Sequence, residues 1–402
     1  MAENKNSSFR WLELILGTII LLVLGSLYAW STYRGTLCEE FQWTASAAQL
    51  TFSICMMTFC LGGLFGGIIL GKVGPKIPLI ISAAFMAAGL FASSHISTLV
   101  GLYITYGVIY GFGVGLGYNA IMGTVVRWFP DKTGLASGTL LMGFGFSSLI
   151  VGKIGARLIG SIGWRATFLD FAIVFGIIVL VFAFFIRPPK EGEVVAPKAT
   201  EKPAAVPYSE KNWKGMLADK NFWLFFIWVI ALSTCGLVIV GNSTPFANTL
   251  LGDLETAATV AGFISICNGL GRLLFGQLFD SLGYKIILVT VGVLFIVATG
   301  VLIAAGATGS YAVLVAAYVL MGFAYGGVTP TNAAFISKFF GRQNFALNLS
   351  IVNCNLLIAS YTPQVATKLL DATGSYNGAW YYMIALAVVA IVIGVFIKTP
   401  KA

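Results

Sequence analysis

Charged residues are scarce in this chain of 402 amino acids. Asp, Glu, Lys and Arg together make up 10% of the sequence, 58% is hydrophobic, and the mean hydropathy is +0.90. Soluble proteins carry about 25% charged residues, and a water-soluble fold of this composition would have a surface made mostly of hydrocarbon. The composition excludes a soluble enzyme, a nucleic-acid-binding module and a disordered scaffold. It predicts an integral protein of the lipid bilayer with no nucleic-acid partner.

The sequence also lacks clusters of catalytic or metal-ligating residues. It has one histidine, His95, and its six cysteines do not show the spacing of a metal or redox site. No group of nucleophile, base and metal ligand occurs, which argues against a membrane enzyme. The one long polar segment is too small to be the output domain of a sensor. We therefore expect no enzymatic activity, no cofactor and no metal.

Long apolar runs are abundant. A membrane-spanning helix needs about 20 apolar residues, and residues 286–306 are apolar on every face, unlike the alternating strands of a membrane barrel. The pattern predicts an all-α membrane protein with twelve transmembrane helices. The predicted spans are 12–33, 48–70, 78–96, 101–126, 136–156, 165–186, 222–247, 257–279, 286–306, 312–336, 345–367 and 378–397.

The positive charges are unevenly distributed about these spans. With both termini placed in the cytoplasm, five of the 24 Lys and Arg residues fall on the opposite side (Arg34, Lys153, Arg157, Arg165 and Lys368). Arg272 falls inside the membrane, and the remaining eighteen fall in cytoplasmic segments. The positive-inside rule therefore predicts a multi-pass protein of the cell (inner) membrane with both termini in the cytoplasm, and the net charge of +9 implies no acidic partner.

The chain divides into two similar halves. Residues 187–220 are charged and proline-bearing, and they predict a cytoplasmic linker with a short interfacial helix near Trp213. We expect six-helix bundles at 1–186 and 221–402. The motif G-x-x-x-G-K-x-G-x-K from Gly67 to Lys76 recurs as G-x-x-x-D-S-x-G-x-K from Gly276 to Lys285, 209 residues later. Parallel six-helix repeats place a binding site between the halves, near the bilayer midplane.

Two cytoplasmic loops carry a family resemblance. The segment RWFPDKTGLASG (127–138) resembles the corresponding loop of the oxalate/formate antiporter family, which is related to the monocarboxylate transporters, and KVGPKIP (72–78) supports the same assignment. The repeated loop motif resembles that of the major facilitator superfamily, although Gly71 stands where the signature usually has Asp. The resemblance covers essentially the whole chain. It implies the major facilitator fold, alternating access, and a central cavity lined by spans 1, 4, 7 and 10.

Arg272 is the strongest functional signal. It lies in span 8, roughly two turns from the cytoplasmic end, where an arginine costs about 2.5–3.5 kcal/mol on insertion scales and stays protonated. Either its guanidinium snorkels or caps backbone carbonyls, or it binds an anion. We favour the anion, because no acidic residue lies at comparable depth, and a carboxylate fits a guanidinium bidentately. Asn268, one turn earlier, either orients Arg272, bonds the substrate, or bonds a neighbouring helix.

The number of buried cations predicts the charge of the substrate. The resemblance implies that oxalate carriers place a second cation, a lysine, in span 11, but the middle of this span reads SIVNCN (350–355) and its only lysine is Lys368, at the far end. A dianion would keep one uncompensated charge in a low dielectric. We therefore predict a small monocarboxylate of the lactate or pyruvate type, moved with a proton carried by the substrate, Asp170 or water. The alternative is an anion exchanger of the oxalate/formate type.

Other polar side chains at suitable depth complete the predicted substrate site, although helix packing is an alternative role for each. They are Tyr28, Tyr118, Asn119, Tyr325, Asn353 and Tyr361. We expect the protein to function as a monomer.

Overall fold

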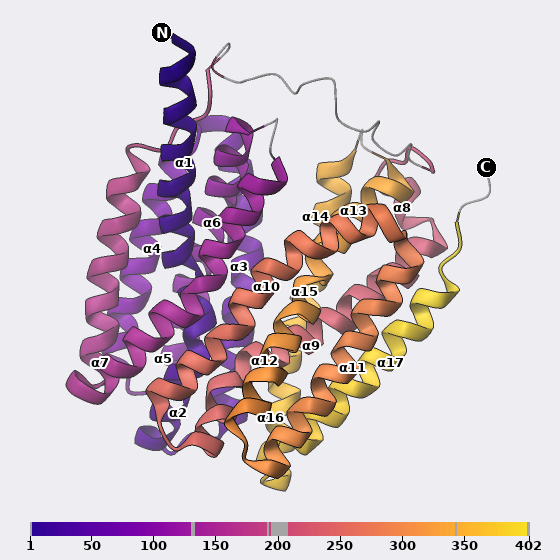
Figure 1. Ribbon diagram of the computed structural model, residues 1–402. Coiled ribbons are helices and arrows are strands. Elements are labelled where there is room, and N and C mark those ends of the chain that lie inside the picture. The colour runs from indigo at the N-terminus through magenta and orange to yellow at the C-terminus, as the bar shows by residue number, and fades with distance from the viewer. Residues whose placement is uncertain (1, 130–132, 191–192, 194–207, 342–343, 400–402) are drawn as a thin grey trace.

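The computed structural model describes residues 2–129, 133–190, 193, 208–341 and 344–399. Within these ranges the chain forms helices and short connections and contains no strand. Two helical halves stand side by side, the first from indigo to magenta and the second from rose through orange to yellow, and α1 begins at the same end of the molecule at which α17 finishes (Figure 1). We call this end the terminal side and the opposite end the far side.

The first half is built from long helices, and its first and fourth spans are interrupted near their middles. Its elements are α1 (Ala2–Leu24), η1 (Gly25–Ala29), α2 (Trp30–Phe41), α3 (Ala45–Val73), α4 (Lys76–Ser94), α5 (Leu99–Leu102), η2 (Tyr103–Tyr110, π-helical), α6 (Gly111–Val125), η3 (Val126–Trp128) and α7 (Thr133–Ala183).

The second half follows the same plan. Its elements are α8 (Trp213–Leu217), α9 (Lys220–Leu251), α10 (Leu254–Leu282), α11 (Tyr284–Thr308), α12 (Tyr311–Gly326), α13 (Val328–Phe340), α14 (Phe345–Asn353), α15 (Asn355–Ala359), α16 (Thr362–Thr373) and α17 (Asn377–Phe396).

Twelve crossings follow from these helices. Ten helices among the described residues are long and apolar enough to cross a membrane. One of them, α7, contains Gly163 in a non-helical conformation (φ 80°, ψ 162°), so it makes two crossings that meet between the predicted spans 136–156 and 165–186. The short helices α14, α15 and α16 together make the remaining crossing. The break in this last crossing, between Asn353 and Asn355, was not predicted.

Glycines allow the helices of the first half to pack backbone to backbone. A Cβ placed on Gly62 of α3 would lie 2.1 Å from the carbonyl oxygen of Phe112, and one on Gly115 of α6 would lie 2.1 Å from that of Phe59. No side chain fits in such a space. The glycine-rich stretch of α6 therefore serves close helix contact, as is usual in membrane bundles.

The two halves touch on the far side. Ser31 Oγ lies 3.1 Å from Thr244 Oγ1, and the backbone N–H of Ser46 donates to Asp371 Oδ2 at 3.0 Å. An ion pair of 3.8 Å joins Lys153 of α7 to Glu255 at the start of α10. These contacts come from the far-side ends of helices of both halves, so the far side is closed in this structure.

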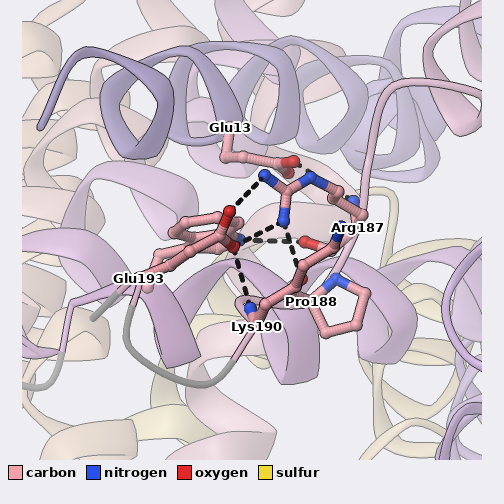
Figure 2. Close-up of polar contacts among 6 residues, drawn as sticks. Glu13, Arg187, Pro188, Lys190 and Glu193 are labelled. Carbon is pink, nitrogen blue, oxygen red and sulfur yellow. Dashed lines mark hydrogen bonds and ion pairs between the residues drawn. The ribbon is translucent and has the colours of Figure 1, made fainter. Parts of the chain in front are cut away.

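On the terminal side, the first residues of the linker are fixed to the first half (Figure 2). The Arg187 guanidinium forms two hydrogen bonds with Glu193, at 2.7 and 3.0 Å, and lies 4.4 Å from the ring centre of Phe9. The Arg187 backbone N–H donates to Glu13 Oε1 at 3.2 Å, and Trp128 Nε1 donates to the Arg187 carbonyl at 2.9 Å. Glu13 is buried within α1, where this bond holds it.

The rest of the linker falls largely outside the described residues. That is the case for 191–192 and 194–207, and also for residues 130–132 and 342–343. Near Trp213 the structure forms the short helix α8, in which Asn212 Oδ1 accepts the backbone N–H of Gly215.

Candidate functional site

A cavity of about 190 Å³ lies between the halves, in the terminal half of the bundle. Helices α3, α6 and α7 contribute to its wall from the first half, and α9, α10, α12 and the broken span 11 from the second. Its polar lining residues are Tyr28, Tyr118, Asn119, Ser233, Arg272, Tyr325, Thr329, Asn332, Asn353 and Asn355.

Arg272 lines this cavity and is only partly buried. Its Nε donates to Asn268 Oδ1 at 3.0 Å, one turn earlier on α10, and its guanidinium contacts the side chain of Tyr118 across the interface between the halves. Asn268 is 7% exposed. Among the described residues, no carboxylate forms an ion pair with Arg272. The cation is therefore oriented by neutral groups and faces a space that a ligand can enter.

Aromatic side chains share the cavity wall with the guanidinium. The rings of Tyr28 and Tyr118 both meet Phe144 edge to face, at centroid distances of 5.3 and 5.2 Å, and Phe59 meets Tyr118 at 5.3 Å. Tyr325 contacts Tyr28 from the other half. An electrostatic bond to Arg272 beside these rings is stronger than the same bond in bulk solvent.

The position of Tyr325 depends on a glycine. A Cβ on Gly236 of α9 would lie 2.1 Å from Tyr325 Cδ2, so the tyrosine ring covers the bare backbone of α9. This contact fixes the ring against the cavity.

The break in span 11 brings amides to the cavity wall. Helix α14 ends at Asn353, which is exposed, and α15 begins at Asn355, which is buried. The Asn355 Nδ2 donates to the carbonyl of Val352 at 2.8 Å, inside the same broken segment. Its Oδ1 and that of Asn332 are buried without a hydrogen-bond partner among the described residues. Unpartnered buried acceptors of this kind suit a site that holds a polar ligand.

The structure brings most of the predicted site together. Tyr28, Tyr118, Asn119, Arg272, Tyr325 and Asn353 all line the cavity. Asn268 lies behind Arg272 and is bonded to it. Part of Asn119 has a structural task, because its Nδ2 donates to the Gly63 carbonyl on α3.

Tyr361 is the exception among the predicted site residues. It lies in the turn between α15 and α16, is 44% exposed, and does not line the cavity. The prediction assumed one continuous helix through span 11, and the break changes which face of the segment meets the cavity. Lining residues that the prediction missed include Met56, Phe59, Ser233 and Thr329, because uncharged residues in apolar spans give little signal.

A family model describes nearly the whole chain. That of the Major Facilitator Superfamily matches residues 14–363. The chain is 27% identical over 364 residues to the uncharacterized MFS-type transporter YhjX of Escherichia coli, with 90% of this chain and 88% of that one covered.

Two relatives have names that state a transport function, and each is matched over most of its length. The chain is 28% identical over 341 residues to the oxalate:formate antiporter of Oxalobacter formigenes, covering 84% of this chain and 80% of that one. It is 23% identical over 385 residues to monocarboxylate transporter 13 of Rattus norvegicus, covering 94% and 86%.

Solved structures share the fold. The xylose transporter XylE from E. coli, in a partially occluded inward open conformation, superposes with a TM-score of 0.69 at 15% identity, covering 97% of each chain. The family matches, the twelve crossings and the repeated halves agree with the resemblance seen in the sequence. The chain belongs to the major facilitator superfamily and is a multi-pass membrane transporter related to the oxalate:formate antiporter and the monocarboxylate transporters.

Proposed function

We propose that the protein is a secondary active transporter that moves a small monocarboxylate of the lactate or pyruvate type by alternating access. One observation carries the proposal: the partly exposed Arg272 guanidinium lines the cavity between the halves and has only neutral partners among the described residues. A carboxylate supplies the missing negative charge and matches the guanidinium geometrically.

The lining of the cavity supports a small, singly charged substrate. Arg272 is the one cation among the described lining residues, so the second charge of a dianion would meet no partner. A volume of about 190 Å³ is below the range of about 300–1,000 Å³ that is usual for drug-sized ligands. The name of the monocarboxylate transporter supports a singly charged substrate, whereas the oxalate:formate antiporter is named for a dianion and a monoanion.

We propose proton symport as the coupling. A proton that travels with the anion makes the cycle electroneutral. The described lining residues include no carboxylate, and Asp170 is exposed on α7 outside the cavity. The proton then moves with the substrate or through water. We further propose that the protein acts as a monomer in the cell (inner) membrane with its termini in the cytoplasm, so that the cavity of this structure belongs to the cytoplasmic half.

Anion exchange of the oxalate/formate type is a second candidate. The lack of a titratable carboxylate among the described lining residues favours it, because an exchanger needs no proton site. The 28% identity to the oxalate:formate antiporter favours it as well. In an exchanger, the empty cavity with its bare cation would not reorient, and each half-cycle would require a bound anion.

Removal of the cation tests the proposed site. We expect Arg272→Gln to abolish uptake of lactate, pyruvate, formate and oxalate in reconstituted vesicles, a loss of at least about 100-fold, which corresponds to about 2.7 kcal/mol of binding. Arg157→Gln is the matched control, because Arg157 is exposed on α7 and does not line the cavity. Normal transport by Arg272→Gln would refute the assigned role.

A vesicle experiment separates the two couplings. Vesicles without internal anion receive external lactate under an imposed pH gradient, acidic outside. Symport predicts uptake that rises with the gradient and collapses with a protonophore. An absolute requirement for internal formate or oxalate, with no response to the gradient, would replace symport with exchange.

A further inference from the structure

A second arginine is buried in the membrane domain, and the substrate site does not use it. Arg34 lies on α2 on the far side and is 2% exposed. Its Nη1 donates to Gln49 Oε1 at 2.6 Å, to the Gly241 carbonyl at 3.3 Å and to Asn242 Oδ1 at 3.0 Å. The Tyr376 side chain contacts it as well.

Most of these partners belong to the opposite half. Gln49 is on α3, in the same half as Arg34, but Gly241 and Asn242 are on α9 and Tyr376 directly precedes α17. All of them are neutral. Asp371, one of the carboxylates of this region, accepts the backbone N–H of Ser46, and no ion pair joins Arg34 to a carboxylate among the described residues.

Arg34 also shares its span with a residue of the main cavity. Tyr28 lines that cavity, and Arg34 follows it six residues later in the same span, about 9 Å further toward the far side. Ser31 and Thr32, between the two, make the far-side contacts with Thr244. Separation of these contacts would expose Arg34 at the mouth of a passage that leads to Tyr28 and Arg272.

We propose that Arg34 is a second anion-binding site, formed only when the far side opens, and that it receives the carboxylate of a substrate arriving from that side. This inference rests on the proposed alternating-access function. Opening withdraws Gly241, Asn242 and Tyr376 and leaves Gln49 as the one acceptor of the described set. The exposed guanidinium then has unfilled donors, and a carboxylate binds them more strongly than a neutral amide does, because the bond is charge-assisted on both sides.

A purely structural role makes the opposite prediction. If Arg34 only holds the far side closed, its removal shifts the protein toward the far-side-open state. The apparent affinity from the far side then rises, because the binding-competent fraction increases. If Arg34 also binds the anion, its removal lowers that affinity. The sign of the change in KM therefore distinguishes the two roles.

The test measures KM from each side separately. Right-side-out and inside-out membrane vesicles are prepared, with an epitope tag at the C-terminus to show which preparation exposes the terminal side. Substrate is whichever of radiolabelled lactate, pyruvate, formate and oxalate the unsubstituted protein carries. For Arg34→Gln we expect KM from the far side to rise about tenfold, and KM from the terminal side to stay within about twofold, which also shows that the variant is folded.

Two further variants sharpen the result. Arg34→Lys keeps the charge, and we expect it to recover part of the far-side affinity. Asn242→Ala weakens the contact between the halves but keeps the guanidinium, so KM from the far side should fall or stay constant. An unchanged or lower far-side KM in Arg34→Gln, or no recovery in Arg34→Lys, overturns the proposal. Transport of none of the four acids, or normal transport by Arg272→Gln, would instead overturn the proposed function.

Discussion

The two intramembrane arginines, Arg34 and Arg272, have different surroundings. Arg34 is fully buried and donates to three acceptors that come from both halves, whereas Arg272 is partly exposed, bonds Asn268 through Nε and faces a cavity. Neither has a carboxylate partner among the described residues. A buried cation whose donors are filled by neutral acceptors joins parts of the protein, and one that faces an unfilled space is available to a ligand.

A third arginine, Arg187, shows what changes at the membrane boundary. It pairs with Glu193, at 2.7 Å between Nη1 and Oε2, outside the spans (Figure 2). Carboxylates are inexpensive to place where water reaches them, but within the bilayer their desolvation costs several kcal/mol per ion. The two intramembrane arginines are therefore held by amides, hydroxyls and carbonyls, which leaves their positive charge uncompensated.

If one uncompensated charge sets the charge of the ligand, a second cation in the cavity should change the selectivity. Asn353 is exposed and lines the cavity, so we expect Asn353→Lys to create a site for a dianion. Two unit charges 4 Å apart attract by about 4 kcal/mol at an effective dielectric constant of 20. After desolvation costs, we expect the affinity for oxalate relative to lactate to rise about 100-fold in competition assays.

Asn353→Gln is the matched control for this variant, because it lengthens the side chain without adding charge. It should leave the ratio of oxalate to lactate affinity unchanged. An equal rise in both variants would mean that cavity shape, and not charge, selects the substrate.

The sequence alone indicates Arg272 as a candidate site residue but does not indicate Arg34, for a physical reason. Arg272 interrupts a long apolar run, so its cost is visible in the sequence. Arg34 follows the apolar part of the first span, and it was assigned to the side opposite the cytoplasm because the predicted span stops at Tyr33. The helix continues to Phe41, and the partners of Arg34 are neutral residues far away in the chain, which leave no charge pattern to detect.

For the fold as well, the sequence predicts some features and misses others. Runs of about 20 apolar residues determine the number of crossings, because each must satisfy its backbone within a helix. The break at 353–355 escaped prediction because residues 350–360 contain neither Gly nor Pro. At the break, the Asn355 side chain donates to the Val352 carbonyl. A side chain that competes with the backbone for a carbonyl in this way has no signature in a hydropathy profile.

A carboxylate placed beside Arg272 should neutralise its charge and so weaken its interaction with the substrate. In Asn268→Asp, the introduced carboxylate accepts from Nε where the amide oxygen now does, and it competes with the substrate. We expect lactate affinity at neutral pH to fall about tenfold, or about 1.4 kcal/mol, relative to the unsubstituted protein measured at the same pH. As the pH falls the introduced group takes up a proton, and the ratio of the two affinities should return toward one.

Asn353→Asp is the control, since it adds a carboxylate to the cavity at a residue that forms no described bond with Arg272. It should weaken lactate binding less, with a smaller return at acidic pH. A ratio that does not change with pH in Asn268→Asp would show that Arg272 is not neutralised from that position.

The smallest effect is expected where water screens the charges. The Arg187 side chain, followed by the Lys190 backbone N–H, lowers the pKa of Glu193 from 4.5 to about 2. A carboxyl whose pKa is lower in the folded state stabilises that state above the unfolded pKa, and this contribution is lost as the pH falls from about 4.5 toward 2. The Tm of the unsubstituted protein in detergent should therefore decline slightly more over this range than that of Glu193→Gln, and the difference should shrink in high salt.

Glu39→Gln, at an exposed residue near the end of α2, is the control and should follow the unsubstituted protein. Parallel Tm curves for Glu193→Gln and the unsubstituted protein at every pH would show that the pair contributes nothing.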